Sequence, residues 1–400
     1  LHIHNYYLQS GGEDQVFRSE TDLLESYGHE VVRYTRHNRE IEHQSRIATG
    51  INTIWNNQVF HELENILPRL KPDVCHVHNT FPIISPSVYY ACKKNHVPIV
   101  QRLPNYRLIC PGALLLRNSQ ICMDCIEKRF PWPGVRHACY RDSRTQSAVV
   151  FAMLSFHRVL HTWQNKVDVY VALNNYGKEL FIRGGLPEDK IMVSPNMVEP
   201  DPGETKQLGS YALYVGRLSK EKGLDTLLDS WKNLPDVPLK IIGDGPLYKE
   251  IEQKIAEEQI SNVELLGHKT HEEAVSILKC ARVLIFPSEW LETFGLGIIE
   301  AFACGVTVIA SRQKTIREII DDGVNGLLCE PGNAFDLAEK VKGVWGQPTT
   351  LKAFSFSARQ SYETRYSKDQ KIQSLMGIYG RAIENNKRSN TGRKNTWHAC

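Results

Sequence analysis

The sequence predicts an α/β fold made of two Rossmann-like, doubly wound domains. Apolar runs typical of buried strands alternate with amphipathic helical runs, and this alternation occurs twice, before and after residues 199–210. The segment between, EPDPGETKQLGS, is rich in proline, glycine and charge, which is typical of a linker. A chain of 400 residues is also long enough for two domains with separate cores.

The first domain is expected over residues 1–198. The runs LHIHNYY, VVRYTR, DVCHVHN, VPIVQRLP, VDVYVALN and IMVS predict its strands, and helical runs lie between them. This order predicts a parallel sheet covered by helices on both faces. No secretory signal precedes the first strand, so we expect a cytoplasmic protein.

The second domain is expected over residues 211–370. Its predicted strands are YALYVG, LKIIGDG, VELLG, ARVLIFPS, VTVIAS and NGLLCE. Two such domains leave a cleft between the carboxyl ends of their sheets, where ligands bind in folds of this kind. For residues 371–400 we expect a C-terminal helix, with a return to the first domain as one option, and then a disordered basic tail.

The composition excludes several classes of protein. Apolar residues make up 42% of the chain and charged residues 23%, and the net charge is only +3 with the basic residues scattered, so nothing requires nucleic acid. No apolar run reaches the roughly 20 residues that span a bilayer. The amphipathic run SAVVFAMLSFHRVLHTW, residues 147–163, predicts a buried core helix, with a peripheral membrane contact as the alternative.

Four of the ten cysteines cluster in one segment, residues 110–139. Cys122 and Cys125 form a Cys-x-x-Cys pair, and Cys110 and Cys139 flank it. Four thiolates in this pattern suit a structural, tetrahedral Zn²⁺ site, whereas an iron–sulfur cluster, packing thiols or disulfides are the alternatives. Such a site would be structural because protein ligands fill all four positions.

A pair of glutamates, Glu292 and Glu300, lies in the run EWLETFGLGIIEAFACG. Eight residues of one helix would leave the two side chains roughly 80° apart, so we expect a loop that carries the first and a helix that carries the second. Gly295, at the turn between them, lets a ligand approach the backbone because it has no Cβ. This arrangement suits a polyhydroxylated ligand with a phosphate near the start of the helix.

Three further loops carry groups that suit phosphate. Arg217 and Lys222 follow a predicted strand in GRLSKEKG, directly after Gly216, and their two cations suit a diphosphate. Gly243 opens the tight turn GDGP, which lacks the third glycine of a dinucleotide fingerprint and gives only weak support for a NAD site. In the first domain, the pair Gly11-Gly12 separates the first strand from the first helix.

These motifs together resemble one enzyme family. GRLSKEKG, GDGP, FPSEWLETFGLGIIEAFACGVTVIAS and the first-loop GG are similar to the retaining, nucleotide-sugar-dependent glycosyltransferases of family four, also called glycosyl transferase group 1. The resemblance spans nearly the whole chain and implies the two-domain GT-B fold. The segments DVCHVHNTFPIISPSVYYA and NYRLICPGALLLRNSQICMDCIEKRFPWPGVRHACYR further resemble a bacterial subgroup with the same four cysteines.

The resemblance implies roles for the charged residues of the second domain. Glu300 would bind the ribose hydroxyls of the nucleotide, and Glu292 would contact the transferred sugar. Arg217 and Lys222 would hold the diphosphate and stabilise its negative charge as it leaves. No Asp-x-Asp occurs in the chain, although this motif usually anchors the divalent ion in metal-dependent glycosyltransferases, so we expect no catalytic metal.

The resemblance also implies backbone contacts. Phe294, Gly295 and Leu296 would contact the sugar or the phosphate, and Gly12 would contact the phosphate from the other domain. Closure of the two domains would bring the first-domain loops onto the donor.

Two departures from the family pattern bear on activity. Where the subgroup usually has a histidine directly before Asn105, this chain has Pro104, so a side chain that could position the sugar or relay a proton is absent. The usual glycine-rich turn before EII is replaced by Lys314 and Thr315. His78 remains in CHVHN, where it either faces the cleft, as Asn105 is expected to, or forms hydrogen bonds at the strand end.

We therefore expect a retaining glycosyltransferase that moves a sugar from a UDP- or GDP-sugar to a glycan or lipid-linked acceptor, in the assembly of surface polysaccharide. Its alternatives are a GT-B nucleotide-sugar epimerase, which transfers to no acceptor, and a catalytically weakened nucleotide-binding scaffold. A dehydrogenase has the weakest support.

Overall fold

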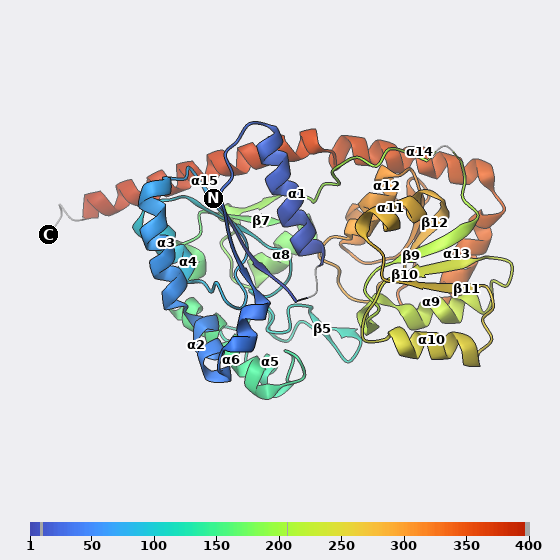
Figure 1. Ribbon diagram of the computed structural model, residues 1–400, viewed down its shortest axis with the longest axis horizontal. Coiled ribbons are helices and arrows are strands. Elements are labelled where there is room, and N and C mark those ends of the chain that lie inside the picture. The colour runs from blue at the N-terminus through green and yellow to red at the C-terminus, as the bar shows by residue number, and fades with distance from the viewer. Residues whose placement is uncertain (9–10, 206, 397–400) are drawn as a thin grey trace. The chain divides into compact units, whose positions relative to one another are not determined.

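A computed structural model describes residues 1–8, 11–205 and 207–396 and divides the chain into two compact units (Figure 1). Unit 1 consists of Leu1–Leu115, Cys122–Pro195 and the C-terminal residues from Lys371. Unit 2 consists of Leu116–Ile121 and Asn196–Gln370. Each unit is built on its own six-stranded sheet, and the fold class that the sequence predicts is confirmed.

The sheet of unit 1 is parallel throughout, with the strand order β2-β1-β3-β4-β7-β8. Its strands are β1 (His2–Tyr6), β2 (Arg33–His37), β3 (Cys75–Asn79), β4 (Ile99–Arg102), β7 (Val169–Ala172) and β8 (Ile191–Val193). The chain passes from β1 to β2 on one side and then to β3 on the other side of β1. The topological switch point of unit 1 therefore lies between β1 and β3.

Helices and short 3-10 turns connect these strands. They are α1 (Gly12–Ser26), η1 (Asn38–His43), α2 (Arg46–Ile54), α3 (Asn57–Leu70), α4 (Ser87–Lys94), α5 (Pro133–Arg136), α6 (Arg144–Val159), α7 (Thr162–Asn165), α8 (Asn175–Arg183) and η2 (Glu188–Lys190). The start of α3 illustrates how the sequence sets these ends. The Asn56 side chain accepts a hydrogen bond from Val59 N, and the helix ends at Lys71, whose backbone is left-handed.

The sheet of unit 2 is also parallel, with the order β11-β10-β9-β12-β13-β14. Its strands are β9 (Tyr211–Val215), β10 (Leu239–Ile242), β11 (Val263–Gly267), β12 (Ala281–Phe286), β13 (Thr307–Ser311) and β14 (Gly326–Cys329). The chain moves outward from β9 to β11 and then returns to the other side of β9 as β12. The switch point of unit 2 therefore lies between β9 and β12.

Helices also connect the strands of unit 2. They are η3 (Lys220–Lys222), α9 (Leu224–Trp231), α10 (Tyr248–Glu257), α11 (His271–Lys279), α12 (Leu296–Ala303), η4 (Ile316–Glu318), α13 (Ala334–Trp345) and α14 (Pro348–Arg365), and a short hairpin, β5 (Leu116–Arg117) and β6 (Gln120–Ile121), is grouped with this unit. The core of unit 2 contains large side chains such as Trp231. This residue is fully buried against the sheet and donates its indole N–H to Val237 O.

The last helix, α15 (Lys368–Thr396), contributes to the core of unit 1 (Figure 1). Ile378 and Ala382 are fully buried with Val100, Val169 and Val171 of the sheet. The sequence predicted a disordered basic tail, but this helix continues to Thr396, and only residues 397–400 of that tail lie outside the described part of the chain. The run is free of proline and rich in lysine and arginine, which favour the helix.

The start of the expected linker packs on unit 2. Asp201 forms an ion pair with Arg359, and Thr205 N donates to Cys304 O. The structure accordingly groups residues 196–205 with unit 2, three residues earlier than the boundary expected from composition. No helix within the described residues is long and apolar enough to cross a membrane.

Candidate functional site

The switch point of unit 2 carries a buried ion pair. Lys222, after β9, lies 2.6 Å from Oε1 of Glu292, which follows β12, and the hydroxyl of Ser288 donates to the same oxygen at 2.5 Å. Glu292 is 5% exposed, and Lys222 also lies over the rings of Phe286 and Trp290. Two residues that the sequence singled out separately are therefore in direct contact where α/β sheets bind ligands.

The two loops that carry this pair are joined through their backbones. Glu289 N donates to Glu221 O at 2.9 Å. Gly223 has a φ of +70°, and a Cβ there would lie 2.0 Å from Pro287 O, so only glycine permits this approach. The position of Lys222 relative to Glu292 is thus set by main-chain contacts.

A third loop packs against them after β10. Gly243 has a φ of +149°, and a Cβ at this position would lie 1.9 Å from Gly216 O. Leu218 N donates to Asp244 O, and Leu247 N donates to Leu218 O. The GDGP motif thus allows the ends of β9 and β10 to pack closely, with Gly216 after the first strand and Gly243 after the second.

The loop–helix arrangement expected for the two glutamates is confirmed. Glu292 lies in the loop, and Glu300 lies in α12, which begins at Leu296. Gly295 precedes the helix with a φ of +98°, and no side chain caps this helix start. Its first N–H groups and the positive end of its dipole suit an anion. Phe294 is buried, with its ring 6.0 Å from that of Tyr366.

Two other predicted residues stand apart from the ion pair. Glu300 is partly exposed, and its Oε1 lies 3.7 Å from Nδ1 of His271 at the start of α11. Arg217 follows β9 directly and has an exposed side chain. Neither of them contacts Lys222 or Glu292 through an ion pair within the described residues.

In unit 1, the Gly11-Gly12 turn opens α1 as expected, and a Cβ at Gly11 would meet no atom within 4 Å. Glu13, the next residue, belongs to the site although no sequence motif singled it out. Its carboxylate accepts hydrogen bonds from Asn105 Nδ2 at 2.8 Å and from the Tyr7 hydroxyl at 3.1 Å. Burial raises the pKa of Glu13. Its signal in the sequence is an acidic residue directly after a glycine pair.

Tyr7 and Asn105 follow β1 and β4, so this polar group lies at the carboxyl end of the sheet of unit 1. Asn105 Oδ1 also accepts from Arg107 N at 3.0 Å, which fixes its orientation. Pro104, which stands where the resemblance to the subgroup implies a histidine, is partly exposed. Of the other altered positions, Lys314 is exposed and Thr315 is fully buried.

His78 does not face a cleft in unit 1, and its ring nitrogens form no hydrogen bond within the described residues, so neither of the two expectations is met. Its side chain is 2% exposed and stacks near His76, with ring centroids 4.3 Å apart. Burial lowers the pKa of His78 well below its ordinary value, and the neighbouring His76 adds to this effect. The reason is that β3 is a central strand with both faces covered, so each of its side chains is interior.

His2, His76 and His78 bring three nitrogen atoms within 4.8 Å of one another. Arg102 and Lys371 lie beside this group, and both form ion pairs with Glu20. Two positive charges in a buried site oppose a third cation, so we interpret the group as part of a buried polar network, in which His2 and His76 form hydrogen bonds and His78 forms none within the described residues. Tyr379 belongs to it and contacts His2 and His76 through its hydroxyl.

The four clustered cysteines are neighbours, but their sulfur atoms are not gathered as closely as the nitrogen atoms of the three histidines. Burial raises the pKa of the Cys125 thiol to about 12, and the nearby Cys110, Cys139 and Cys122 contribute. In the described part of the chain, only the three histidines place three ligand atoms within 4.8 Å of one another, so no three of the four sulfur atoms are that close together. No disulfide joins any of the nine cysteines that the structure describes.

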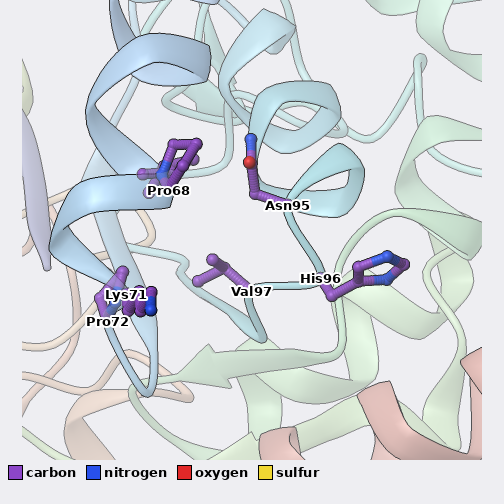
Figure 2. A pocket seen from close by; sticks show the side chains of 7 residues that line it. Pro68, Lys71, Pro72, Asn95, His96 and Val97 are labelled. Atoms are coloured by element: carbon purple, nitrogen blue, oxygen red, sulfur yellow. The ribbon is translucent and has the colours of Figure 1, made fainter.

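A hollow of about 400 Å³ lies between the ends of α3 and α4 (Figure 2). Pro68, Lys71 and Pro72 line it on one side and Asn95 and Val97 on the other. These residues precede β3 and β4, so the hollow lies at the amino ends of the strands. Ligands of such sheets bind at the opposite edge, and we do not assign function to this hollow.

Comparison with known proteins agrees with the family suggested by these motifs. Residues 202–361 match the family model of the group 1 glycosyl transferases. An uncharacterized glycosyltransferase of Methanocaldococcus jannaschii is 34% identical over 170 residues, which cover 42% of this chain and 48% of that protein. The chain thus spans about half the length of this relative. A D-rhamnosyltransferase of Pseudomonas aeruginosa is 26% identical over 61% of this chain and 70% of its own.

The fold comparison extends over both units. The structure of HepE from Anabaena in complex with UDP superposes with a TM-score of 0.68 and 16% identity, and it covers 95% of this chain and 99% of that protein. At this identity the likeness concerns the fold.

Proposed function

Because the chain has the two-domain GT-B fold and its residues 202–361 match the group 1 glycosyl transferases, we propose that it is a retaining glycosyltransferase. It transfers a sugar from a UDP- or GDP-sugar to a glycan or lipid-linked acceptor in the biosynthesis of surface polysaccharide. The observation that carries the proposal is the Lys222–Glu292 pair at the switch point of unit 2. The UDP complex of HepE and the D-rhamnosyltransferase among the relatives support the donor class and the setting.

The proposed donor site uses charges without a catalytic metal. Arg217 and Lys222 bind the diphosphate, and the uncapped start of α12 faces the same phosphate oxygens. As the sugar–phosphate bond breaks, negative charge grows on the leaving nucleoside diphosphate, and these fixed positive groups stabilise it. Glu292 contacts the sugar hydroxyls.

Glu300 is proposed to bind the ribose. It lies one turn or so into α12, is partly exposed, and therefore can accept hydrogen bonds from two adjacent hydroxyls. In unit 1, we propose that the Glu13–Asn105 pair takes part in acceptor recognition, since it lies at the carboxyl end of that sheet. The Glu13 carboxyl is held by two hydrogen bonds and is thus oriented before any ligand binds.

The first test of the donor site is thermal unfolding with UDP, GDP and nucleotide sugars in metal-free buffer. A nucleotide at 100 times its Kd stabilises the folded chain by about 2.7 kcal/mol, so we expect a clear rise in Tm with one base. The Glu300→Ala variant should lose this rise, because the ribose contact is removed. Glu272→Ala, a change of an exposed residue on α11, is the matched control and should keep it.

The outcomes separate the alternatives. If no nucleotide raises Tm of the folded wild type, the donor-site proposal is wrong. Nucleotide binding with no donor hydrolysis and no transfer would favour a scaffold, for which the changes at Pro104, Lys314 and Thr315 are the motivating features. Conversion of the sugar without transfer would favour the epimerase.

We also propose a peripheral contact with the inner face of the membrane through α2 and α6 of unit 1. The two helices pack closely, since a Cβ at Gly50 would lie 3.4 Å from a methyl of Val149. Ile51 on α2 and Phe156 on α6 are exposed, and so is Ile47, at 78%. Such side chains can insert between lipids, and exposed arginines at the helix starts attract anionic headgroups.

The membrane contact predicts binding to vesicles. We expect the protein to co-sediment with vesicles of phosphatidylglycerol and phosphatidylethanolamine, and the Ile51→Glu variant to lose most of this binding because it places a charge in the apolar surface. Phe356→Glu changes an equally exposed apolar residue on α14 of unit 2 and should bind like the wild type. Equal binding by both variants would contradict the assignment to α2 and α6.

A further inference from the structure

The segment between β4 and α6 has very little regular secondary structure. Over residues 103–143 the structure contains only the two-residue strands β5 and β6 and the four-residue helix α5. Eight of the thirteen non-glycine residues with positive φ in the described chain lie here: Ala113, Leu115, Asn118, Ser119, Glu127, Ala138, Arg141 and Asp142. Each such residue costs roughly 1 kcal/mol or more, so something must hold this segment in place.

Tight turns bring the cysteine-bearing loops of this segment together. Ala113 N donates to Cys110 O at 2.9 Å, and Cys139 N donates to Gly134 O at 2.9 Å. The two loops touch, because a Cβ at Gly112 would lie 3.0 Å from Cys139 O. Pro111 packs on the other loop in the same way, with its Cγ 2.6 Å from a Cβ built at Gly134.

The middle pair is held in the same neighbourhood. Cys122 N donates to Leu115 O at 2.7 Å, and Ile126 N donates to Met123 O, so the Cys-x-x-Cys stretch forms a compact turn. Cys125 is buried, with its sulfur 3.8 Å from Pro131 O. Turns of the segment thus bring four thiols into one neighbourhood, beside buried apolar side chains such as Ile109 and Leu115.

We propose that Cys110, Cys122, Cys125 and Cys139 bind one structural Zn²⁺ ion that holds the cysteine-bearing loops of unit 1 together. Four thiolates complete a tetrahedral site. The ion adds to the buried apolar contacts of this irregular segment, as structural metal ions do in other small irregular modules. Its effect reaches Asn105, because Cys110 N donates to Tyr106 O and Tyr106 N to Ala113 O.

The charge of the surrounding segment suits such a site. A Zn²⁺ ion with four thiolates carries a net charge of −2. Between residues 103 and 143 the chain has six basic residues, Arg107, Arg117, Lys128, Arg129, Arg136 and Arg141, against three acidic residues, Asp124, Glu127 and Asp142. This excess of positive charge offsets the charge of the complex.

Ion binding requires the sulfur atoms to move closer together. A Zn–S distance of about 2.3 Å places tetrahedral sulfur atoms roughly 3.8 Å apart. No three of the described thiols lie within 4.8 Å of one another, so the side chains must rotate inward when the ion binds. Three of the four cysteines are only partly buried, which leaves them room for this rotation.

The test is the metal content of the full-length protein, purified without chelator and analysed by elemental analysis. We expect about one zinc ion per chain in the wild type and a loss of at least tenfold in Cys125→Ser. Cys280→Ser changes an exposed cysteine of unit 2 and should keep the ion. If Cys125→Ser fails to fold, a second measurement on the wild type replaces this comparison. Co²⁺ is added to the demetallated wild type, and we expect the visible absorption of a tetrahedral thiolate complex.

Several results would overturn the proposal. A folded wild-type protein that contains no zinc and gives no Co²⁺ spectrum would exclude the site. Fewer than ten titratable thiols in the denatured, unreduced protein would indicate disulfides instead. An iron content with a brown chromophore would indicate an iron–sulfur cluster. None of these measurements depends on glycosyl transfer, so this proposal and the proposed function fail separately.

Discussion

Replacement of Lys222 by alanine is expected to lower kcat for donor hydrolysis by about 10²- to 10³-fold, with a much smaller effect on the affinity for the nucleotide. The reason is that the lysine stabilises charge that develops on the departing diphosphate, and this charge is larger in the transition state than in the bound donor. The measurement is the rate of nucleotide release from the nucleotide sugar that raises Tm, at saturating donor and without acceptor.

Lys222 also neutralises Glu292, so a structural explanation has to be tested separately. Lys222→Ala leaves a carboxylate of low exposure without its cation, which destabilises the loop. The double variant Lys222→Ala/Glu292→Gln removes that uncompensated charge and should regain stability but not activity. Recovery of kcat in the double variant would show that the loss in Lys222→Ala comes from the uncompensated Glu292 carboxylate and not from a missing charge on the diphosphate. Lys220→Ala, a change of an exposed lysine in the same loop, should leave kcat unchanged.

The loop–helix placement of Glu292 and Glu300 could be predicted because it follows from local rules. Eight residues cannot put two side chains on one face of a helix, and Gly295 marks where the helix starts. The strands of both units could be predicted for the same reason, since buried parallel strands are short apolar runs bounded by turns.

The contact between Lys222 and Glu292 could not be predicted from the sequence alone. It exists because β12 returns to the side of β9, and a strand order of this kind depends on packing of residues far apart in the chain. The same holds for Glu13 and Asn105, which are 92 positions apart and meet only when β1 and β4 share a sheet.

The burial of His78 could not be predicted from its local sequence either. A histidine at the end of a strand has the same local sequence whether the strand is central or at an edge. Its burial is decided by the elements around β3: the ring of Phe17 on α1 lies 5.2 Å from that of His78, and the ring of His2 on β1 lies 5.1 Å away. The sequence around His78 gave no indication of these neighbours.

Glu20→Gln is expected to lower the free energy of unfolding of unit 1 by about 3–5 kcal/mol. Oε1 of Glu20 lies 2.5 Å from Arg102 and 2.8 Å from Lys371, and all three side chains are almost fully buried. Without the carboxylate, two buried cations face each other with no counter-charge, and α15 loses its ionic attachment. Hydrogen exchange should show lower protection over α15 and β4, whereas the peptides of unit 2 keep theirs.

The pH dependence of stability supplies an independent check on the same network. Burial alone would raise the pKa of Glu20, but the charges of Arg102 and Lys371 outweigh it and hold this pKa below the ordinary value of 4.5. A depressed carboxyl pKa contributes stability above the unfolded value, and that contribution is lost as the pH falls through the folded value. His76 and His78, which face the carboxylate from β3, stay neutral down to low pH because burial lowers the pKa of both.

Wild type should therefore lose stability steeply below about pH 4.5, and Glu20→Gln should lack this part of the slope. Glu25→Gln is the matched control, since Glu25 lies on the same helix and pairs with Arg33 at 2.7 Å on the surface. An exposed pair contributes at most about 1 kcal/mol, so this variant should unfold nearly as the wild type does. Equal losses in the two variants would mean that the buried network does not anchor α15 to unit 1.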